Sequence, residues 1–297
     1  MTRPLRLDDC IQAFITDEVI RGSSSHTIAY YTRVLRYFRE RANVETLDEL
    51  TATACANYVL SLMQSDLAST SVQTYVRGLR VFLRWLCDNE YMETDLSRRV
   101  RLPKAQRKVI DVLTEDELRH LLMHFRLDDF HELRNLCAVL LMVGSGLRMS
   151  EVVSLRADRL HLAERFAIVD GKCNKQRIVP VCQFAVPYFE RYFAMKPPSE
   201  FLICQQSGKA VTVTTVKDLF RKLKKTTGIS RLHPHLLRHT FATRYLENGG
   251  NIYSLQTILG HSTLEMVKRY LHLDTSTVRK NFDVCSPVDC LQLERTS

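Results

Sequence analysis

The sequence lacks several features that define common classes of protein. No Cys-x-x-Cys pair occurs among its nine scattered cysteines, so neither a zinc ribbon nor a dithiol redox motif is indicated. The first ten residues, MTRPLRLDDC, contain no apolar segment of the kind that a signal peptide needs. The longest uncharged apolar stretch, Leu136–Leu147, is too short to span a bilayer and predicts a buried helix instead. We therefore expect reduced cysteines, no membrane association and a cytoplasmic location.

Acidic side chains are also in short supply. The 297 residues contain 42 Lys and Arg against 33 Asp and Glu, which gives a net charge of +9 and an isoelectric point of about 9.1. This excess favours a polyanionic partner, most often nucleic acid; the alternative is a basic protein without such a partner. The chain length predicts two domains, each with a core of its own.

Residues 1–97 are predicted to be helical. Ser23-Ser24-Ser25 can cap a helix whose apolar side chains recur at helical spacing, and a second helix starts near Ser69-Thr70-Ser71. A basic stripe follows this second helix beside its apolar face: Arg77, Arg80 and Arg84. The stripe is either a solvated face or a surface that contacts DNA phosphates.

A basic segment follows the helical region. The sequence RRVRLPKAQRK contains Pro103 and no acid, and its lack of apolar periodicity predicts an extended linker that can lie along a nucleic-acid backbone. Its six basic residues are Arg98, Arg99, Arg101, Lys104, Arg107 and Lys108. Thr114 and Glu117 then fit a capping box that starts a new helix.

The remainder of the chain mixes helices with one hairpin. GSGLRMSEVVSL predicts a short turn followed by a helix that starts near Ser145 or Gly146. In FAIVDGKCNKQRIVPV, the β-rich runs Phe166–Val169 and Ile178–Val181 flank a polar turn, which is the clearest hairpin signal in the chain. Helical patterns then return and continue to about Tyr270.

These patterns predict a mainly α fold with a small β-sheet, divided into two domains. We expect a helical domain over residues 1–104, a basic linker over 105–110 and a second domain over 111–297.

The segment Leu232–His272 concentrates groups that carry positive charge or transfer protons. It holds five histidines, four arginines or lysines and three tyrosines, but only two acids. Such a composition fits a solvated basic helix pair, a metal site or an active site for an anionic substrate. His235 and His239 have the spacing of a helical zinc pair, yet no nearby Asp, Glu or Cys completes the ligand set, and Arg238 between them would repel a cation. We therefore expect no metal and no cofactor.

Six residues in and before this segment are candidates for catalysis: Arg148, Lys172, His235, Arg238, His261 and Tyr270. Arg148 lies at the turn-to-helix junction GLRMSE, and Lys172 lies in the hairpin turn GKCNK. His235 and Arg238 form an H-x-x-R pair, whose spacing puts both on one helix face. His261 and Tyr270 lie nine residues apart in LGHSTLEMVKRYLH. Taken singly, each has an ordinary structural explanation, such as a salt bridge, a helix cap or a core aromatic.

Taken together, the blocks GLRMSEVVSL, DGKCNKQRIVPV, HPHLLRHTFATRYLENG and LGHSTLEMVKRYLH resemble the tyrosine recombinases of the phage-integrase and Xer type. The blocks occur in the order found in that family, and the helical N-terminal region is similar to the family's core-binding, SAM-like domain. The resemblance therefore covers nearly the whole chain. One departure is Cys173, at a position where many members carry glycine, but it removes no catalytic group.

The resemblance implies a role for each candidate. Arg148 and Arg238 resemble the two catalytic arginines of the family, and Lys172 resembles its mobile hairpin lysine. His235 and His261 resemble the two catalytic histidines. Tyr270 resembles the nucleophile, so that the implied product is a 3′-phosphotyrosine.

The residue types suit this chemistry without reference to any family. Two guanidiniums can clamp the non-bridging oxygens of a phosphodiester, where negative charge builds up during cleavage. A cationic surrounding stabilises a phenolate, and a histidine can accept the phenolic proton. A lysine can protonate the departing oxygen. The covalent product keeps the energy of the phosphodiester bond, so that resealing needs neither ATP nor metal.

The resemblance also implies partners and an assembly. It predicts a two-domain clamp around double-stranded DNA, a homotetramer on two DNA sites and strand exchange through a Holliday junction. The biological role would be chromosome-dimer resolution, phage integration or the movement of another mobile genetic element. Two alternatives are a type IB topoisomerase-like relaxing enzyme and a catalytically silent DNA-binding accessory protein.

Overall fold

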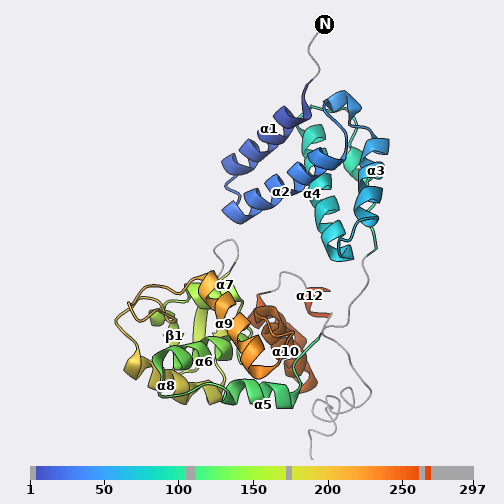
Figure 1. Cartoon of the computed structure of the whole chain (residues 1–297). Helices are drawn as coiled ribbons and strands as arrows, with labels where there is room; N and C mark the ends of the chain where they lie inside the picture. The colour runs from blue at the N-terminus through green and yellow to red at the C-terminus, as the bar shows by residue number, and fades with distance from the viewer. Residues whose placement is uncertain (1–4, 105–110, 172–175, 261–264, 269–297) are drawn as a thin grey trace, which may run out of the picture. The chain divides into compact units, whose positions relative to one another are not determined.

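The computed structural model describes residues 5–104, 111–171, 176–260 and 265–268. The chain divides into two compact units, Met1–Lys108 and Val109–Ser297 (Figure 1). Each unit has its own hydrophobic core. Helices dominate both units, and a three-stranded sheet lies in the second unit. The predicted fold class, mainly α with a small β-sheet, is confirmed.

The first unit is a helical domain whose longest helix is α4. Its elements are α1 (Leu7–Ile20), α2 (Ser25–Arg41), the 3-10 turn η1 (Leu47–Glu49), α3 (Ala52–Met63), α4 (Ser69–Asp88) and the 3-10 turn η2 (Leu96–Arg98). Helix α4 contacts α1, α2 and α3. The Phe14 ring lies edge-on to Phe82 and Trp85, with ring centroids 5.6 and 5.5 Å apart. The predicted start of α2 is confirmed, because Ser24 accepts a hydrogen bond from the N–H of Thr27 at 3.2 Å.

The prediction of an extended linker from Arg98 onward is wrong for the first residues of that segment. Residues Leu96–Arg98 form η2, and Val100 is buried in the core of the first unit. Arg80 of α4 donates from Nε to the carbonyl of Ser97 at 3.1 Å and thereby ties η2 to the helix. An apolar side chain at position 100 thus anchors a segment whose charges suggested full solvation.

The second unit is built around helix α6. Its helical elements are α5 (Glu115–Met123), α6 (Phe130–Val143), α7 (Met149–Ser154), η3 (Ala157–Arg159), η5 (Gln183–Ala185), α8 (Val186–Met195), α9 (Val213–Thr227), α10 (Pro234–Glu247), α11 (Ile252–Leu259) and α12 (Glu265–Lys268). Helix α6 contacts α7, α8 and α10. Every residue from Leu136 to Val143 is buried, which confirms the predicted buried helix up to its end at Val143.

The sheet of the second unit contains the predicted hairpin and one further strand. Strands β2 (Phe166–Asp170) and β3 (Gln176–Pro180) pair antiparallel, with Ile168 opposite Ile178. The hairpin prediction is therefore confirmed. The two-residue strand β1 (Leu160–His161) completes the order β1-β2-β3 and was not predicted, because two residues are too few to show an alternating pattern.

The chain before α5 is bound to the loop that leads into α10. Thr114 and Glu117 form the predicted capping box, and Glu117 also accepts two hydrogen bonds from Arg231, both at 2.6 Å. The Arg231 hydrogen bonds and the N–H of Thr114 lower the pKa of Glu117 to about 2. The N–H of Leu113 donates to the hydroxyl of Thr240, at 3.0 Å, within α10. These contacts hold the helix on which His235 and Arg238 lie.

Within the described ranges, no helix is both long and apolar enough to cross a membrane. The six cysteines in those ranges are free: Cys10, Cys55, Cys87, Cys137, Cys182 and Cys204.

Candidate active site

The site begins at the N-terminus of α7, where Arg148 is the N-cap residue. The helix starts at Met149, three to four residues later than the predicted start near Ser145 or Gly146. Its start is set by Glu151, whose carboxylate accepts a hydrogen bond from the N–H of Arg148 at 2.7 Å. The same carboxylate accepts from the Arg148 guanidinium at 2.9 Å. The side chain of Arg148 is 34% exposed, whereas that of Glu151 is 7% exposed. Glu151 therefore holds the guanidinium of Arg148 from the buried side.

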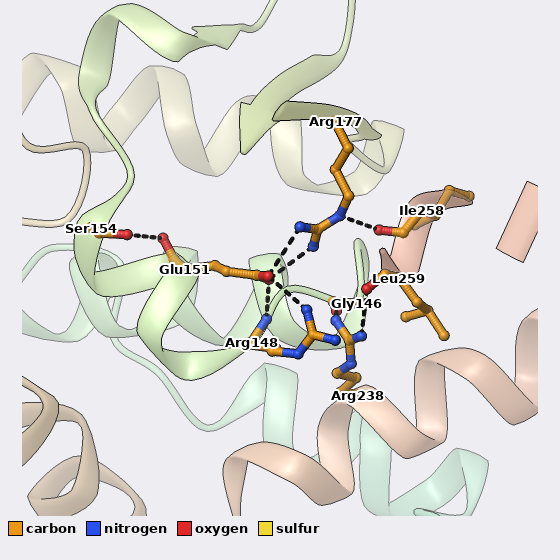
Figure 2. A network of polar contacts seen from close by, with 8 residues as sticks. All are labelled: Gly146, Arg148, Glu151, Ser154, Arg177, Arg238, Ile258 and Leu259. Carbon is orange, nitrogen blue, oxygen red and sulfur yellow. Dashed lines mark hydrogen bonds and ion pairs between the residues drawn. The ribbon is translucent and has the colours of Figure 1, made fainter. Parts of the chain in front are cut away.

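A second arginine, Arg177 of β3, completes the surroundings of Glu151. Its two terminal nitrogens donate to the two carboxylate oxygens at 3.0 and 2.9 Å, in a bidentate pair (Figure 2). Burial alone would raise the pKa of Glu151, but the hydrogen bonds from Arg177 and from the Arg148 N–H, together with both positive charges, hold that pKa below its ordinary value. The carboxylate is thus a buried negative charge between two guanidiniums.

Arg177 also reaches the C-terminal end of α11. Its Nε donates to the carbonyl of Ile258 at 2.8 Å. Gly260 caps the helix in the left-handed conformation, with φ of 63°, and a Cβ atom there would lie 3.1 Å from both Cδ and Nε of Arg177. A glycine is needed at this position both for its backbone conformation and for the space that the guanidinium occupies.

Arg238 of α10 binds the same end of α11 from another direction. It is 4% exposed, and its terminal nitrogens donate to the carbonyl of Gly146 at 2.5 Å and to that of Leu259 at 2.7 Å (Figure 2). The last carbonyls of a helix carry partial negative charge and have no partner within the helix. Arg177 and Arg238 satisfy two of them and so fix the point at which the chain leaves α11.

His235 lies one helical turn before Arg238, on the exposed part of the site. Partial burial of its ring, and then the positive charges of Arg238 and Arg148, lower the pKa of His235 below its ordinary value. The hydrogen bond from Arg238 to the Gly146 carbonyl, two residues before Arg148, places the start of α7 beside α10 (Figure 2). A neutral imidazole in that position can accept a proton.

The described residues contain no evident metal site. No three His, Cys, Asp or Glu side chains gather there in an arrangement that could hold a metal ion. His233 is the N-cap of α10, and its Nδ1 accepts a hydrogen bond from the N–H of Leu236 at 2.9 Å.

The structure brings together half of the predicted catalytic set. Arg148, His235 and Arg238 converge, although they come from helices separated in the sequence by the sheet, α8 and α9. The other three, Lys172, His261 and Tyr270, lie outside the described residues.

Two residues of this site were missed by the sequence analysis. Glu151 follows Arg148 by three positions, and this capping-box spacing was a usable signal. Arg177 lies in the hairpin block, where nothing local shows that its side chain reaches α7 and α11.

The predicted DNA-contacting residues of the first unit differ in their surroundings. Arg77 and Arg84 are exposed, and Arg84 pairs with Asp88 at 3.5 Å. Arg80 is half-buried against η2, and Arg98 pairs with Asp95 at 3.2 Å. Arg99, Arg101 and Lys104 are exposed. Arg107 and Lys108 lie outside the described residues.

Comparison with known proteins gives consistent matches over most of the chain. Residues 111–277 match the phage integrase family, and residues 12–90 match the N-terminal SAM-like domain of phage integrases. The tyrosine recombinase XerD of Oceanobacillus iheyensis is 28% identical over 280 residues, which cover 90% of this chain and 94% of that protein. The XerD of Halalkalibacterium halodurans is 30% identical over 274 residues, or 88% and 92% of the two chains.

Among solved structures, the Tn1549 transposon integrase in complex with a circular intermediate DNA shares the fold. The TM-score is 0.74 at 20% identity, and the match covers 93% of this chain and 99% of that chain.

Proposed function

The chain belongs to the phage integrase family and is a site-specific tyrosine recombinase, and from this premise we propose how its residues cut and rejoin DNA. The observation that carries the proposal is the meeting of Arg148 from α7 with His235 and Arg238 from α10. Two arginines and a histidine of lowered pKa form a site suited to a phosphodiester.

In the proposed reaction, Tyr270 attacks the scissile phosphorus while the bond from phosphorus to the 5′ oxygen breaks. Arg148 and Arg238 stabilise the charge that develops on the non-bridging oxygens. His235 accepts the phenolic proton, Lys172 protonates the departing 5′ oxygen, and His261 supports the phosphate as the second histidine. The product is a 3′-phosphotyrosine with a free 5′ hydroxyl. Attack by the 5′ hydroxyl of another strand reverses the step, and sequential exchanges pass through a Holliday junction without ATP or metal.

Trapping of the covalent intermediate tests this proposal. The probe is a nicked suicide duplex made from the sequence that the wild-type chain selects out of a randomised duplex pool. The wild type should form an adduct that is stable on a denaturing gel, and Tyr270→Phe should form none while still shifting the duplex on a native gel.

Tyr253→Phe is the matched control, because Tyr253 lies in the same part of the chain and is 63% exposed. It should form the adduct at the wild-type rate. An adduct with Tyr270→Phe would remove Tyr270 as the nucleophile.

The alternatives weighed from the sequence are not favoured. The relatives that match about nine-tenths of this chain are named as tyrosine recombinases, and the predicted catalytic blocks are all present. A topoisomerase-like enzyme would relax a supercoiled plasmid that carries a single site, without exchanging strands. We expect this chain to form recombinant products from plasmids that carry two sites. We expect no relaxation of the plasmid that carries a single site.

For the DNA interface, we propose that the exposed arginines of α4 and the basic segment after η2 contact phosphates. Arg77, Arg84, Arg99, Arg101 and Lys104 are exposed cations in the first unit. Arg80 and Arg98 belong to the same proposal, although Arg80 also serves the packing of η2. Arg107 and Lys108 complete the set.

The domain boundaries of the proposal are residues 1–104, 105–110 and 111–297. Burial of Val100 and the hydrogen bond from Gln73 to the Pro103 carbonyl, at 2.7 Å, support an N-terminal domain that extends to residue 104. The hydrogen bond from Leu113 to Thr240 supports a catalytic domain that begins shortly before α5.

We also propose that four copies assemble on two DNA sites and that the protein works in the cytoplasm. Exchange of both strands between two duplexes needs one nucleophile for each of four strand cuts, which a homotetramer supplies. In bacteria, from which the similar XerD proteins come, the DNA lies in the cytoplasm.

A further inference from the structure

Arg177 is buried at the back of the proposed active site and belongs to none of the roles assigned above. Its side chain is 9% exposed. It donates hydrogen bonds to two different elements, the Glu151 carboxylate of α7 and the Ile258 carbonyl of α11. Arg177 thus joins its own strand, β3, to α7 and α11. Each of these three elements carries or adjoins a proposed reacting group.

The charges around Glu151 indicate what this arrangement does. Glu151 contacts Arg148 at 2.9 Å and Arg177 at 2.9 Å, so that the three side chains carry a net charge of one positive unit. Without Arg177, the carboxylate would have Arg148 as its remaining ion-pair partner within the described residues. The two would then neutralise each other, and the site would present less positive charge to a phosphate.

The contact with α11 adds a second effect. The Ile258 carbonyl lies at the negative end of the helix, where a guanidinium is favourable. Gly260, directly above the Arg177 side chain, is followed by His261. The same guanidinium therefore contacts both the carboxylate that holds Arg148 and the C-terminal end of α11.

We propose that Arg177 is a positioning residue for DNA cleavage, which occupies the Glu151 carboxylate so that the positive charge of Arg148 is available to the scissile phosphate, and which holds the end of α11 against β3. This inference rests on the proposed function. It assigns Arg177 no contact with DNA; the residue acts through Glu151 and through the α11 carbonyl.

Cleavage of two substrates by a neutral variant tests the charge effect. Arg177→Gln is compared with the wild type on the selected suicide duplex and on the same duplex with a methylphosphonate at the scissile position, which carries no negative charge. On the phosphodiester, the single-turnover rate should fall on the order of a hundredfold, as for loss of one preorganised donor. On the methylphosphonate, where the charge of Arg148 matters less, the loss should shrink to about fivefold or less.

A second change should restore part of the activity. In Arg177→Gln/Glu151→Gln, the negative charge that would neutralise Arg148 is gone. This double variant should cleave the phosphodiester at least about tenfold faster than Arg177→Gln alone, which is a coupling that only interacting residues show. Arg177→Lys, which keeps the charge, should lose less than Arg177→Gln and covers the case in which the neutral variant does not fold.

The matched control is Arg156→Gln. Arg156 also lies in the second unit and pairs with a carboxylate, that of Glu200 at 2.8 Å, but the pair is exposed. Its cleavage rates should equal those of the wild type on both substrates. Equal losses for Arg177→Gln on the two substrates, without recovery by Glu151→Gln, would overturn the proposal and leave Arg177 a purely structural residue. Failure of the wild type to form any adduct would instead overturn the proposed function, and the role of Arg177 with it.

Discussion

At the scale of single residues, His235 shows how the neighbours of a group set its chemistry. Partial burial, and then the positive charges of Arg238 and Arg148, disfavour the protonated ring and lower the pKa of His235. The ordinary pKa of histidine is about 6.5, so that the ring in this site is neutral at pH 7. The two positive charges that would bind the phosphate thus also keep the proposed base ready to accept a proton.

We predict that cleavage falls on the acid side as the pH drops through the lowered pKa of His235, because a protonated ring cannot accept the phenolic proton. Arg148→Ala removes one positive neighbour, so the pKa of His235 should rise and the acid limb should move to higher pH. Arg148→Lys keeps the charge and should leave the pKa near that of the wild type.

An NMR titration of the His235 ring in the DNA-free chain measures these pKa values directly, and single-turnover rates against pH follow the acid limb. A His235 pKa that is the same in Arg148→Ala and the wild type would show that Arg148 does not act on this ring.

At the scale of elements, β3 and α10 meet at the C-terminal end of α11, and Arg177 links this point to α7. Two arginines bind consecutive carbonyls, those of Ile258 and Leu259, and Gly260 closes the helix in the left-handed conformation. This end is built for close contact, because no side chain separates the Gly260 backbone from the Arg177 guanidinium.

We predict that Gly260→Ala destabilises the fold and slows cleavage. An L-residue in the left-handed conformation costs about 1–2 kcal/mol. The new methyl group would in addition lie 3.1 Å from Arg177 and push it from Glu151. Thermal unfolding and the rate of adduct formation measure the two effects.

Gly228→Ala is the control, since Gly228 caps α9 with φ of 72° and an added Cβ would meet no atom within 4 Å. It should lower stability to a similar or smaller extent and leave cleavage by the folded protein unchanged. Equal cleavage rates for the two folded variants would contradict the importance of the contact with Arg177.

At the scale of the whole molecule, the net charge of +9 suits a protein that binds DNA. The basic segment that follows η2 concentrates part of this charge at the C-terminal end of the first unit. Its members Arg99, Arg101 and Lys104 are exposed, and no ion pair is formed by these three in the described structure.

We predict that replacing Arg99, Arg101 and Lys104 with alanine weakens binding to all duplex sequences alike. Each phosphate contact contributes roughly 0.9 to the slope of log affinity against log salt concentration, so the slope should flatten by about 2 to 3 units. Fluorescence anisotropy at several salt concentrations, with selected and unrelated duplexes, measures this change.

The control removes three exposed guanidiniums that already pair with carboxylates. These are Arg119, which lies 3.5 Å from Asp116, Arg126, which lies 3.9 Å from Asp128, and Arg156, which pairs with Glu200 at 2.8 Å. The control variant should keep the wild-type slope. If both triple variants change the slope equally, the basic segment contributes only through the overall charge of the protein.

Local signals in the sequence predicted much of this structure correctly. Ser24 and Thr114 cap the helices that they were expected to cap, and the β-hairpin pairs as predicted. Such features depend on residues a few positions apart, whose spacing is visible in the sequence. The prediction that the linker starts at Arg98 was wrong because it considered the charges of the segment but not the burial of Val100.

The sequence by itself determined the family of this protein, its mainly helical fold and its proposed reacting groups, because these depend on residue types and on short, ordered motifs. Only the tertiary structure decided how the groups are supported. Arg177 contacts Glu151 from 26 residues away and Ile258 from 81 residues away. Contacts at such separations depend on how β3, α7 and α11 pack, and packing arises from burial of apolar surface over the whole unit. The partners of a buried charge are therefore set by the complete fold and cannot be found in any one motif.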